Sequence, residues 1–284
     1  SDKLIYANEE ANKRYILRDD ILHPLPTSPP AFIKTKLFSV KAKLRLFAEP
    51  FIGKSKDGYY QSIAQFVRRR LGNEFLDYAI NPFVAGVFAG NPEELSVKSS
   101  FPKLYALEEN YGGLIKGMIK GGRERKKRNE VSKQNAKMIS FKGGIRNLPE
   151  AIAVKLKDSI IFSAEVKSVK KLNDQYSITY IKDGKEVSLN ADAVLSTLPA
   201  FIAAPVFSEL DGTLARHLES IYYPPVLVLY LAYEKESVGQ NLDGFGFLIP
   251  EKEKKSFLGA LWSSVIFEDR KSDTHASFTL FIGG

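Results

Sequence analysis

The sequence has no cysteine and only three histidines, and these shortages exclude several kinds of chemistry. Without cysteine the chain can form no disulfide, no zinc–thiolate site and no thiol nucleophile. The histidines, His23, His217 and His275, lie far apart and lack the spacing of metal ligands. We therefore expect no metal site and no catalytic side chain of the hydrolytic kind. The absence of cysteine also suits a reducing compartment.

Long hydrophobic runs are absent as well. No apolar stretch reaches the roughly 20 residues that cross a bilayer, and the best candidate, residues 83–88, is short and follows a proline. The sequence contains no G-x-G-x-x-G, no P-loop, no G-x-S-x-G and no H-E-x-x-H. A dinucleotide site that depends on the glycine fingerprint is therefore not encoded in these residues.

The composition indicates a folded protein with a basic surface. The chain has 284 residues, 44% of them hydrophobic, which is enough for one large or two ordinary domains. The formal net charge is +8. Positive charge is densest from Arg123 to Lys133, where it forms either a solvated surface or a patch for anionic lipid or nucleic acid.

Hydrophobic periodicity predicts strands at the start of the chain and helices after them. Residues 4–25 have the composition of strands, and Asp19-Asp20 is placed to form a hairpin turn. A proline-rich loop follows. Residues 38–120 contain apolar residues at helical spacing, for example Ile63, Phe66 and Val67.

Short β segments dominate the rest of the sequence. Asp183-Gly184 predicts another hairpin turn. The expected strands cover residues 160–162, 166–172, 176–181, 187–189, 193–195, 226–233, 245–249, 257–263 and 276–282. Since β structure resumes after the helices, the helical block reads as an insertion, and the fold class is mixed α+β.

Three stretches resemble the protoporphyrinogen oxidase family of flavoenzymes, and they occur in the family's order. They are residues 83–96 (FVAGVFAGNPEELS), residues 140–149 (SFKGGIRNLP) and residues 244–250 (GFGFLIP). The resemblance implies oxidation of protoporphyrinogen IX to protoporphyrin IX, with FAD and oxygen, in haem synthesis. The flavin would carry the redox step, so no catalytic side chain is expected.

The resemblance also implies a domain plan. Residues 1–37 would form a β hairpin and loop of the substrate domain, and residues 38–137 a helical insertion that approaches membranes. Residues 138–200 would be the middle portion of an FAD-binding domain, and residues 201–284 the mixed β-sheet of the substrate domain. The family's amino-terminal phosphate loop and carboxy-terminal flavin segment have no counterpart here, so we expect this chain to be inactive alone and to purify without FAD.

Candidate site residues follow from the same resemblance. Val166 would meet the FAD adenine through its backbone, while Gly143, Gly144 and Pro199 would lie beside the cofactor. Substrate-binding residues would be Phe245, Gly246 and Leu248, with Leu231 on the opposite wall. Aromatic and aliphatic faces suit a flat macrocycle. A base near the proline-rich loop, Lys34 or Lys36, would pair with a propionate, although neither aligns cleanly.

The implied partners are protoporphyrinogen IX and a membrane surface, with a homodimer also compatible and no nucleic acid expected. Phe83, Val84 and Phe88 would contribute to a peripheral contact on the inner face of the cell membrane, with the protein on the cytoplasmic side. Two alternatives stay open. One is another flavin amine oxidase relative that acts on amines or carotenoids. The other is a basic module that binds membrane or nucleic acid through residues 120–133.

Overall fold

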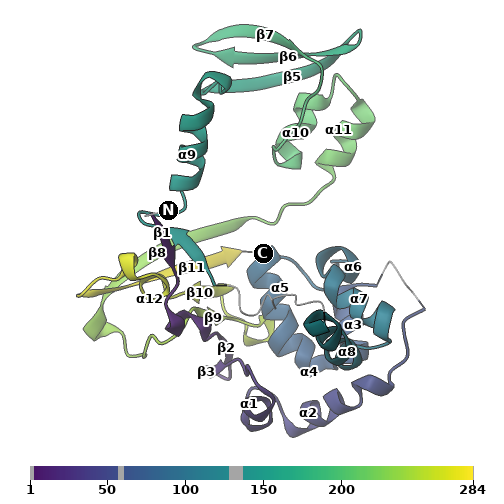
Figure 1. Ribbon diagram of the computed structural model, residues 1–284, viewed down its shortest axis with the longest axis vertical. Helices are drawn as coiled ribbons and strands as arrows, with labels where there is room; N and C mark the ends of the chain where they lie inside the picture. The colour runs from purple at the N-terminus through teal and green to yellow at the C-terminus, as the bar shows by residue number, and fades with distance from the viewer. Residues whose placement is uncertain (1–2, 57–60, 128–136, 284) are drawn as a thin grey trace. The chain divides into compact units, whose positions relative to one another are not determined.

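The computed structural model describes residues 3–56, 61–127 and 137–283, and the chain divides into two compact units (Figure 1). One unit combines Ser1–Gly144 with Pro224–Gly284, and the other is Ile145–Tyr223. The boundaries of these units fall after Gly144 and Tyr223, whereas the domains expected from the sequence were residues 138–200 and 201–284. Residues 128–133 of the basic run lie outside the described residues.

The first unit is built on a six-stranded mixed sheet with the strand order β3-β2-β9-β10-β11-β8. Strands β2 and β9 pair in parallel, and the other neighbours are antiparallel. The amino-terminal hairpin and the carboxy-terminal strands therefore share one sheet, which chain order alone could not establish. The strands are β2 (Tyr15–Arg18), β3 (Ile21–Pro24), β8 (Val226–Glu234), β9 (Gly246–Leu248), β10 (Gly259–Leu261) and β11 (His275–Gly283).

The predicted hairpin turn at Asp19-Asp20 is confirmed. Both residues have positive φ values, 52° and 60°, as a two-residue turn between right-twisted strands requires. A separate antiparallel pair joins β1 (Leu4–Tyr6) to β4 (Ile139–Phe141). This pair brings the Gly-Gly element after β4 close to the start of the chain, where Lys142 N donates to Lys3 O at 2.7 Å.

The predicted helical block is also confirmed. Serine side chains cap the amino-terminal ends of four of its described helices, and Ser62 forms a reciprocal capping box with Gln65. The side chains at the predicted helical spacing, Ile63, Phe66 and Val67, are fully buried in the largest core cluster. The helices are α1 (Pro29–Lys34), α2 (Val40–Phe47), α3 (Ile63–Arg70), α4 (Asn73–Phe75), α5 (Asn81–Phe88), α6 (Val97–Ser100), α7 (Pro102–Tyr111) and α8 (Leu114–Lys127), and a short helix α12 (Ser263–Ile266) follows β10.

A buried ion network ties the helices together. Arg70, with no exposed surface, forms ion pairs with Glu49 at 3.0 Å and with Glu108 at 3.0 Å. Glu49 in turn accepts hydrogen bonds from the backbone N–H groups of Leu114 at 2.7 Å and Ile115 at 3.1 Å, which begin α8. Each buried charge has its partner, so the network orients α3, α7 and α8 without leaving an isolated ion in the core.

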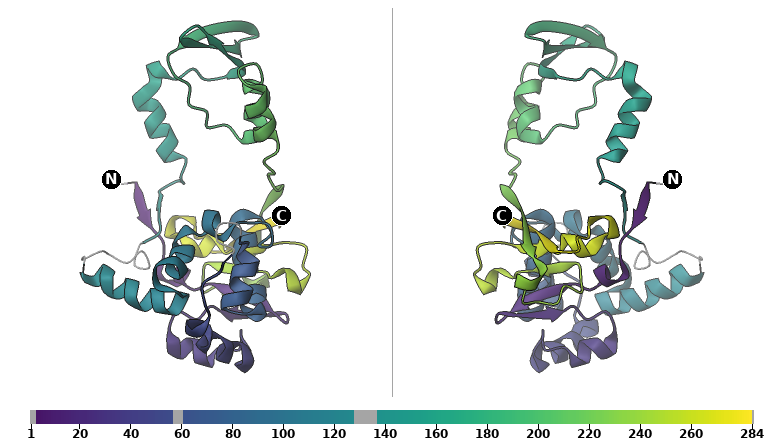
Figure 2. Two further views of the ribbon diagram at one scale, coloured as in Figure 1. Left: turned by 90° about the vertical axis from the view of Figure 1, so that its right-hand side faces the viewer. Right: turned by 90° about the vertical axis from the view of Figure 1, so that its left-hand side faces the viewer.

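The second unit is an antiparallel meander with three helices, and both views of Figure 2 show its strands as neighbours. The turn at Asp183-Gly184 is confirmed, with φ values of 52° and 73°. The elements are α9 (Asn147–Leu156), β5 (Ala164–Leu172), β6 (Gln175–Lys182), β7 (Lys185–Ala191), α10 (Ala200–Phe207) and α11 (Gly212–Glu219).

Two short strand predictions in this unit were wrong. Residues 160–162 and 193–195 form no strand, and Leu195 is 90% exposed. An apolar triplet becomes a strand only where a neighbouring strand accepts its hydrogen bonds, and no described strand pairs with either segment. Helix α10 was missed because its apolar run has no clear period, which leaves helix and strand indistinguishable from the sequence.

Candidate functional site

An apolar cavity of about 220 Å³ lies in the first unit, where helix α5 meets strands β9 and β10. Arg14 is its only charged lining residue. The cavity combines aromatic and aliphatic walls with one cation at its edge, which suits a ligand that is largely flat and apolar but carries an anionic group. Its lining residues are Arg14, Tyr15, Leu25, Phe83, Gly86, Val87, Phe245, Gly246, Phe247, Leu248, Leu258, Gly259, Ala260, Leu261 and Phe281.

Glycine makes the close approach of β9 and β10 possible. Gly246 has a φ of 138°, and a Cβ atom there would lie 2.1 Å from the carbonyl oxygen of Ala260. Gly259, opposite Leu248, has a φ of 157°, and its Cβ would lie 2.4 Å from the carbonyl oxygen of Phe247. A side chain at either position would push the two strands apart and change the cavity wall.

Three of the four residues predicted to bind substrate meet at this cavity. Phe245, Gly246 and Leu248 all line it. Leu231 does not: it lies on the edge strand β8, opposite Phe278 of β11. Two strands, spaced about 4.8 Å apart, separate β8 from β9, which accounts for the absence of Leu231 from the cavity lining.

Arg14 is a candidate that the sequence interpretation missed. Its guanidinium carbon lies 5.2 Å from the centroid of the Phe245 ring. The backbone carbonyl of Arg14 accepts a hydrogen bond of 2.8 Å from Leu25 N, so the residue lies directly beside the proline-rich loop. The available signal was a pair of bases, Lys13 and Arg14, immediately before a strand whose hairpin partner ends at Pro24.

The expected carboxylate anchors lie in a neighbouring hollow. Lys34 and Lys36 line a space of about 640 Å³, together with Lys13, His23 and Arg14. Neither of these two lysines lines the apolar cavity. Arg14 is the cation common to both spaces, and this makes it the better placed partner for an anionic group on a ligand in the apolar cavity.

A carboxylate next to this site holds Tyr15, which lines the apolar cavity, and Lys13, which lines the neighbouring hollow. Asp243 accepts a hydrogen bond from the Tyr15 hydroxyl at 2.5 Å and another from Lys13 Nζ at 2.6 Å. The Lys13 and Tyr15 bonds lower the pKa of Asp243. Burial and the bond to Asp243 raise the pKa of Tyr15 to about 12, so its hydroxyl stays a donor at neutral pH.

The residues expected beside the cofactor lie in both units. Gly143 and Gly144 form a turn after β4 with φ values of 81° and 105°, and Gly143 N donates to Asp269 Oδ2 at 3.2 Å. Their positive φ values account for the glycine pair. In the second unit, Pro199 begins helix α10, and Val166 lies on β5, where the pairing with β6 shifts between Val166 and Ser168.

The surroundings of Val166 fit contact with an adenine through the backbone. β5 is an edge strand of its sheet, so within the described residues no strand pairs with its outer side. Unpaired N–H and C=O groups on such an edge can bond the donor and acceptor atoms of a purine. The Val166 side chain is partly exposed, and this leaves room for a flat ring beside it.

The predicted membrane residues are corrected in part. Val84 has no exposed surface and belongs to the core of the helical block. Phe83 lines the apolar cavity, and both Phe83 and Phe88 pack on the ring of Phe101. Helix α5 therefore buries Val84, whereas Phe83 and Phe88 stay 44% and 39% exposed. Within the part of the chain that the structure describes, no helix has the length and hydropathy needed to cross a membrane.

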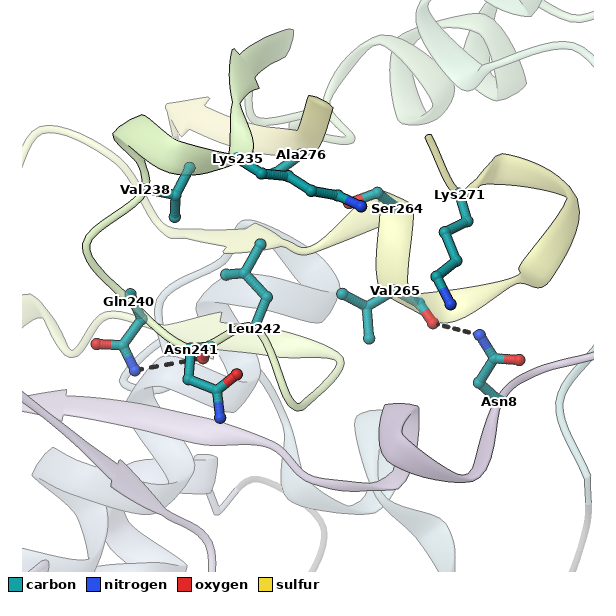
Figure 3. Close-up of a pocket in the computed structure, with 10 residues that line it drawn as sticks. All are labelled: Asn8, Lys235, Val238, Gln240, Asn241, Leu242, Ser264, Val265, Lys271 and Ala276. Atoms are coloured by element: carbon teal, nitrogen blue, oxygen red, sulfur yellow. Dashed lines mark hydrogen bonds between the residues drawn. The ribbon is translucent and has the colours of Figure 1, made fainter. Parts of the chain in front are cut away.

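A second, polar hollow of about 270 Å³ appears in Figure 3. Its polar groups bond mainly to the protein itself: Asn8 Nδ2 donates to Val265 O at 2.8 Å, and the Ser264 hydroxyl accepts from Ser277 N at 3.1 Å. Lys235 and Lys271 line it from exposed positions. Across residues 3–56, 61–127 and 137–283, no group of His, Asp and Glu side chains could hold a metal ion. The apolar cavity is therefore the candidate site.

The fold and the cavity agree with a family of flavoproteins. The chain belongs to the flavin containing amine oxidoreductase family, whose sequence profile matches residues 2–284. This match supports the predicted class, a flavin-dependent oxidoreductase.

The similar proteins within that family include enzymes of porphyrin synthesis. Protoporphyrinogen oxidase 2 of Arabidopsis thaliana is 34% identical over 299 residues, which cover 96% of this chain and 59% of that protein. Coproporphyrinogen III oxidase of Bacillus subtilis is 28% identical over 268 residues, covering 92% of this chain and 56% of that protein. The chain thus spans somewhat more than half the length of these relatives.

A solved structure confirms the fold. A candidate protoporphyrinogen oxidase from Exiguobacterium sp. 255-15 superposes with a TM-score of 0.70 at 19% identity, covering 99% of this chain and 60% of that one. The predicted mixed α+β class is therefore correct.

Proposed function

We propose that the protein containing this chain oxidises protoporphyrinogen IX to protoporphyrin IX with FAD as its electron acceptor. The observation that carries this proposal is the apolar cavity with Arg14 at its edge. A porphyrinogen has the matching chemistry, since its macrocycle is broad and apolar and its propionates are anionic.

The side chains of the cavity have separable roles in this proposal. Phe245 and Leu248 pack against the macrocycle and exclude water from it. Gly246 permits the close approach of β9 and β10 that shapes this wall. Arg14 forms a charge-assisted hydrogen bond with a propionate, and this bond orients the macrocycle against the apolar wall.

Val166, Gly143, Gly144 and Pro199 are the residues that would hold FAD in this chain. Bound flavin would accept the reducing equivalents that leave the tetrapyrrole and pass them to oxygen. The sequence contains no G-x-G-x-x-G to bind the pyrophosphate. We therefore expect this chain by itself to purify without FAD and to be inactive.

The direct test uses the full-length protein with its flavin. Under anaerobic conditions, protoporphyrinogen IX should bleach the flavin absorbance near its long-wavelength band, and admission of oxygen should restore it with formation of fluorescent porphyrin. Benzylamine and putrescine serve as comparison substrates. Bleaching by an amine and none by a porphyrinogen would overturn the proposal in favour of an amine oxidase.

A second candidate substrate is coproporphyrinogen III. It carries more propionates than protoporphyrinogen IX and would need additional cations around the site. The hollow lined by His23, Lys34 and Lys36 beside Arg14 favours this candidate. This candidate would be supported if the KM for coproporphyrinogen III is lower than that for protoporphyrinogen IX and rises in Lys34→Gln and Lys36→Gln variants. If the variants have the same KM for coproporphyrinogen III as the wild type, the hollow has no role in binding it.

A peripheral membrane contact on the cytoplasmic side is also part of the proposal, and we assign it to α2, whose apolar side chains are more exposed than those of α5. Lys34, Lys36 and Lys41 lie exposed in the same region and would favour anionic headgroups. Three apolar side chains of α2 recur at helical spacing and point outward: Val40 is 71% exposed, Leu44 64% and Phe47 63%. Phe51, in the short 3-10 helix that follows α2, is 90% exposed.

A further inference from the structure

Asp243 joins the two residues that flank Arg14. One carboxylate oxygen accepts from the Tyr15 hydroxyl at 2.5 Å, and the other accepts from Lys13 Nζ at 2.6 Å. Asp243 stands immediately before the segment 244–248, which supplies Phe245, Gly246 and Leu248 to the cavity. The carboxylate therefore connects both chain segments that form the charged side of the site.

Backbone contacts fix the same two segments at short range. Phe245 N donates to Lys13 O at 2.8 Å, and Tyr15 lies opposite Phe247 in the parallel pairing of β2 with β9. A Cβ at Gly244 would lie 2.9 Å from Lys13 O and 2.9 Å from Tyr15 Cε2. The Tyr15 ring also packs on buried Trp262, with 5.3 Å between ring centroids.

Arg14 itself has little else to hold its side chain. Within the described residues its guanidinium makes one hydrogen bond, a long one of 3.4 Å to Asn12 O. Its other contact is the ring of Phe245, at 5.2 Å. The Arg14 side chain is exposed, and the backbone on either side of it is held at Lys13 and Tyr15.

We propose that Asp243 is a positioning residue for carboxylate recognition: by holding Lys13 and Tyr15, it keeps Arg14 at the edge of the cavity over Phe245. The carboxylate does not touch the ligand in this arrangement. It acts through Arg14, and it also keeps Lys13 paired, so that the cation facing a bound propionate is Arg14.

The inference rests on the proposed function, and its test separates the two. In the full-length protein, Asp243→Asn should raise the KM for protoporphyrinogen IX about fivefold while kcat changes less than twofold, since an amide oxygen can accept from only one of the two donors in the same geometry. With the dimethyl ester of the same porphyrinogen, which lacks the anionic groups, Asp243→Asn should leave KM unchanged.

A matched control is available on the same unit. Asp77 is paired with Lys252 at 2.9 Å, and the side chains of this pair are 30% and 59% exposed, against 30% and 57% for Asp243 and Lys13. Asp77→Asn should leave both KM values as in the wild type. Tyr15→Phe, which keeps the Lys13 pair, should raise the KM for the diacid less than Asp243→Asn does.

Each outcome bears on one proposal. If the wild-type protein does not oxidise the porphyrinogen, the proposed function fails before the variants are compared. If it does, and Asp243→Asn changes the KM for the diacid and the ester equally, Asp243 has only a structural role and the inference is wrong. The double variant gives a second test. If Asp243→Asn raises the KM for the diacid as much in an Arg14→Gln background as in the wild type, the inference is also wrong, because a residue that acts through Arg14 has no further effect once Arg14 is gone.

Discussion

The guanidinium of Arg14 lies over the ring of Phe245, with 5.2 Å between the guanidinium carbon and the ring centroid. The two residues are at opposite ends of the sequence, and the parallel pairing of β2 with β9 brings their segments together. The contact joins the charged edge of the site to its apolar wall, and cation–π attraction stabilises it by about 1 kcal/mol at an exposed position.

Arg14 should determine affinity for the propionates. In the full-length protein, Arg14→Gln should raise the KM for protoporphyrinogen IX about tenfold, because a charge-assisted bond is lost. Arg14→Lys should recover only part of this loss, since an ammonium lacks the planar fork of guanidinium. The KM values of both variants are measured by steady-state porphyrin fluorescence. The control is Arg146→Gln, at an exposed position of the second unit. Equal KM values in all four proteins would remove Arg14 from the site.

Gly246 should be intolerant of any side chain. Gly246→Ala places a Cβ 2.1 Å from Ala260 O at a φ of 138°, so the strands must separate or the backbone must change. We expect a loss of about 3 kcal/mol in the free energy of unfolding, measured by urea denaturation. Gly239→Ala is the matched control, because its Cβ would meet no atom within 4 Å. A Gly246→Ala protein as stable as this control would contradict the close approach of β9 and β10.

Stability at acid pH should depend on Glu108. Burial alone would raise the pKa of Glu108, but hydrogen bonds from Arg70 and Arg69 lower this pKa from 4.5 to about 2. Because the folded-state pKa lies below the unfolded value, the carboxylate stabilises the fold above about pH 4.5. This contribution, on the order of 3 kcal/mol, is lost as the pH falls toward 2.

The Glu108→Gln variant tests this pH dependence. Its free energy of unfolding should be about 3 kcal/mol lower than that of the wild type at pH 7, and the difference should narrow as the pH falls from 4.5 toward 2. The exposed neighbour Glu109→Gln should behave as the wild type. A difference between wild type and Glu108→Gln that stays constant over this pH range would show that ionisation of Glu108 is not responsible.

The outward face of α2 should determine vesicle binding. Replacement by serine of both Leu44 in α2 and Phe51 in the 3-10 helix that follows it removes two highly exposed apolar side chains. We expect binding to vesicles with phosphatidylglycerol to fall at least tenfold in a flotation assay. Phe162→Ser, at a 61% exposed position of the second unit, should have no effect. Unchanged flotation of the double variant would rule out α2 as the docking surface.

The sequence by itself was sufficient for both hairpin turns, the helical block and the family. Paired turn residues at Asp19-Asp20 and Asp183-Gly184 predicted both hairpins, because only a few residue types adopt positive φ at low cost. Ile63, Phe66 and Val67 predicted a buried helix face, since the helical period is a local property. Likewise, residues 244–250 identified Phe245, Gly246 and Leu248, which meet at the cavity.

Only the tertiary structure decided which distant residues meet. Leu231 lies on β8 and Phe245 immediately precedes β9 of the same sheet, but strand order separates them, and the order depends on pairing between remote segments. Val84 has the same apolar character as its neighbours, and its burial depends on what packs against α5. In the sequence, Arg14 is only one of two adjacent bases that precede a strand. Its role follows from the parallel pairing that places it beside Phe245, with Asp243 between its two neighbours.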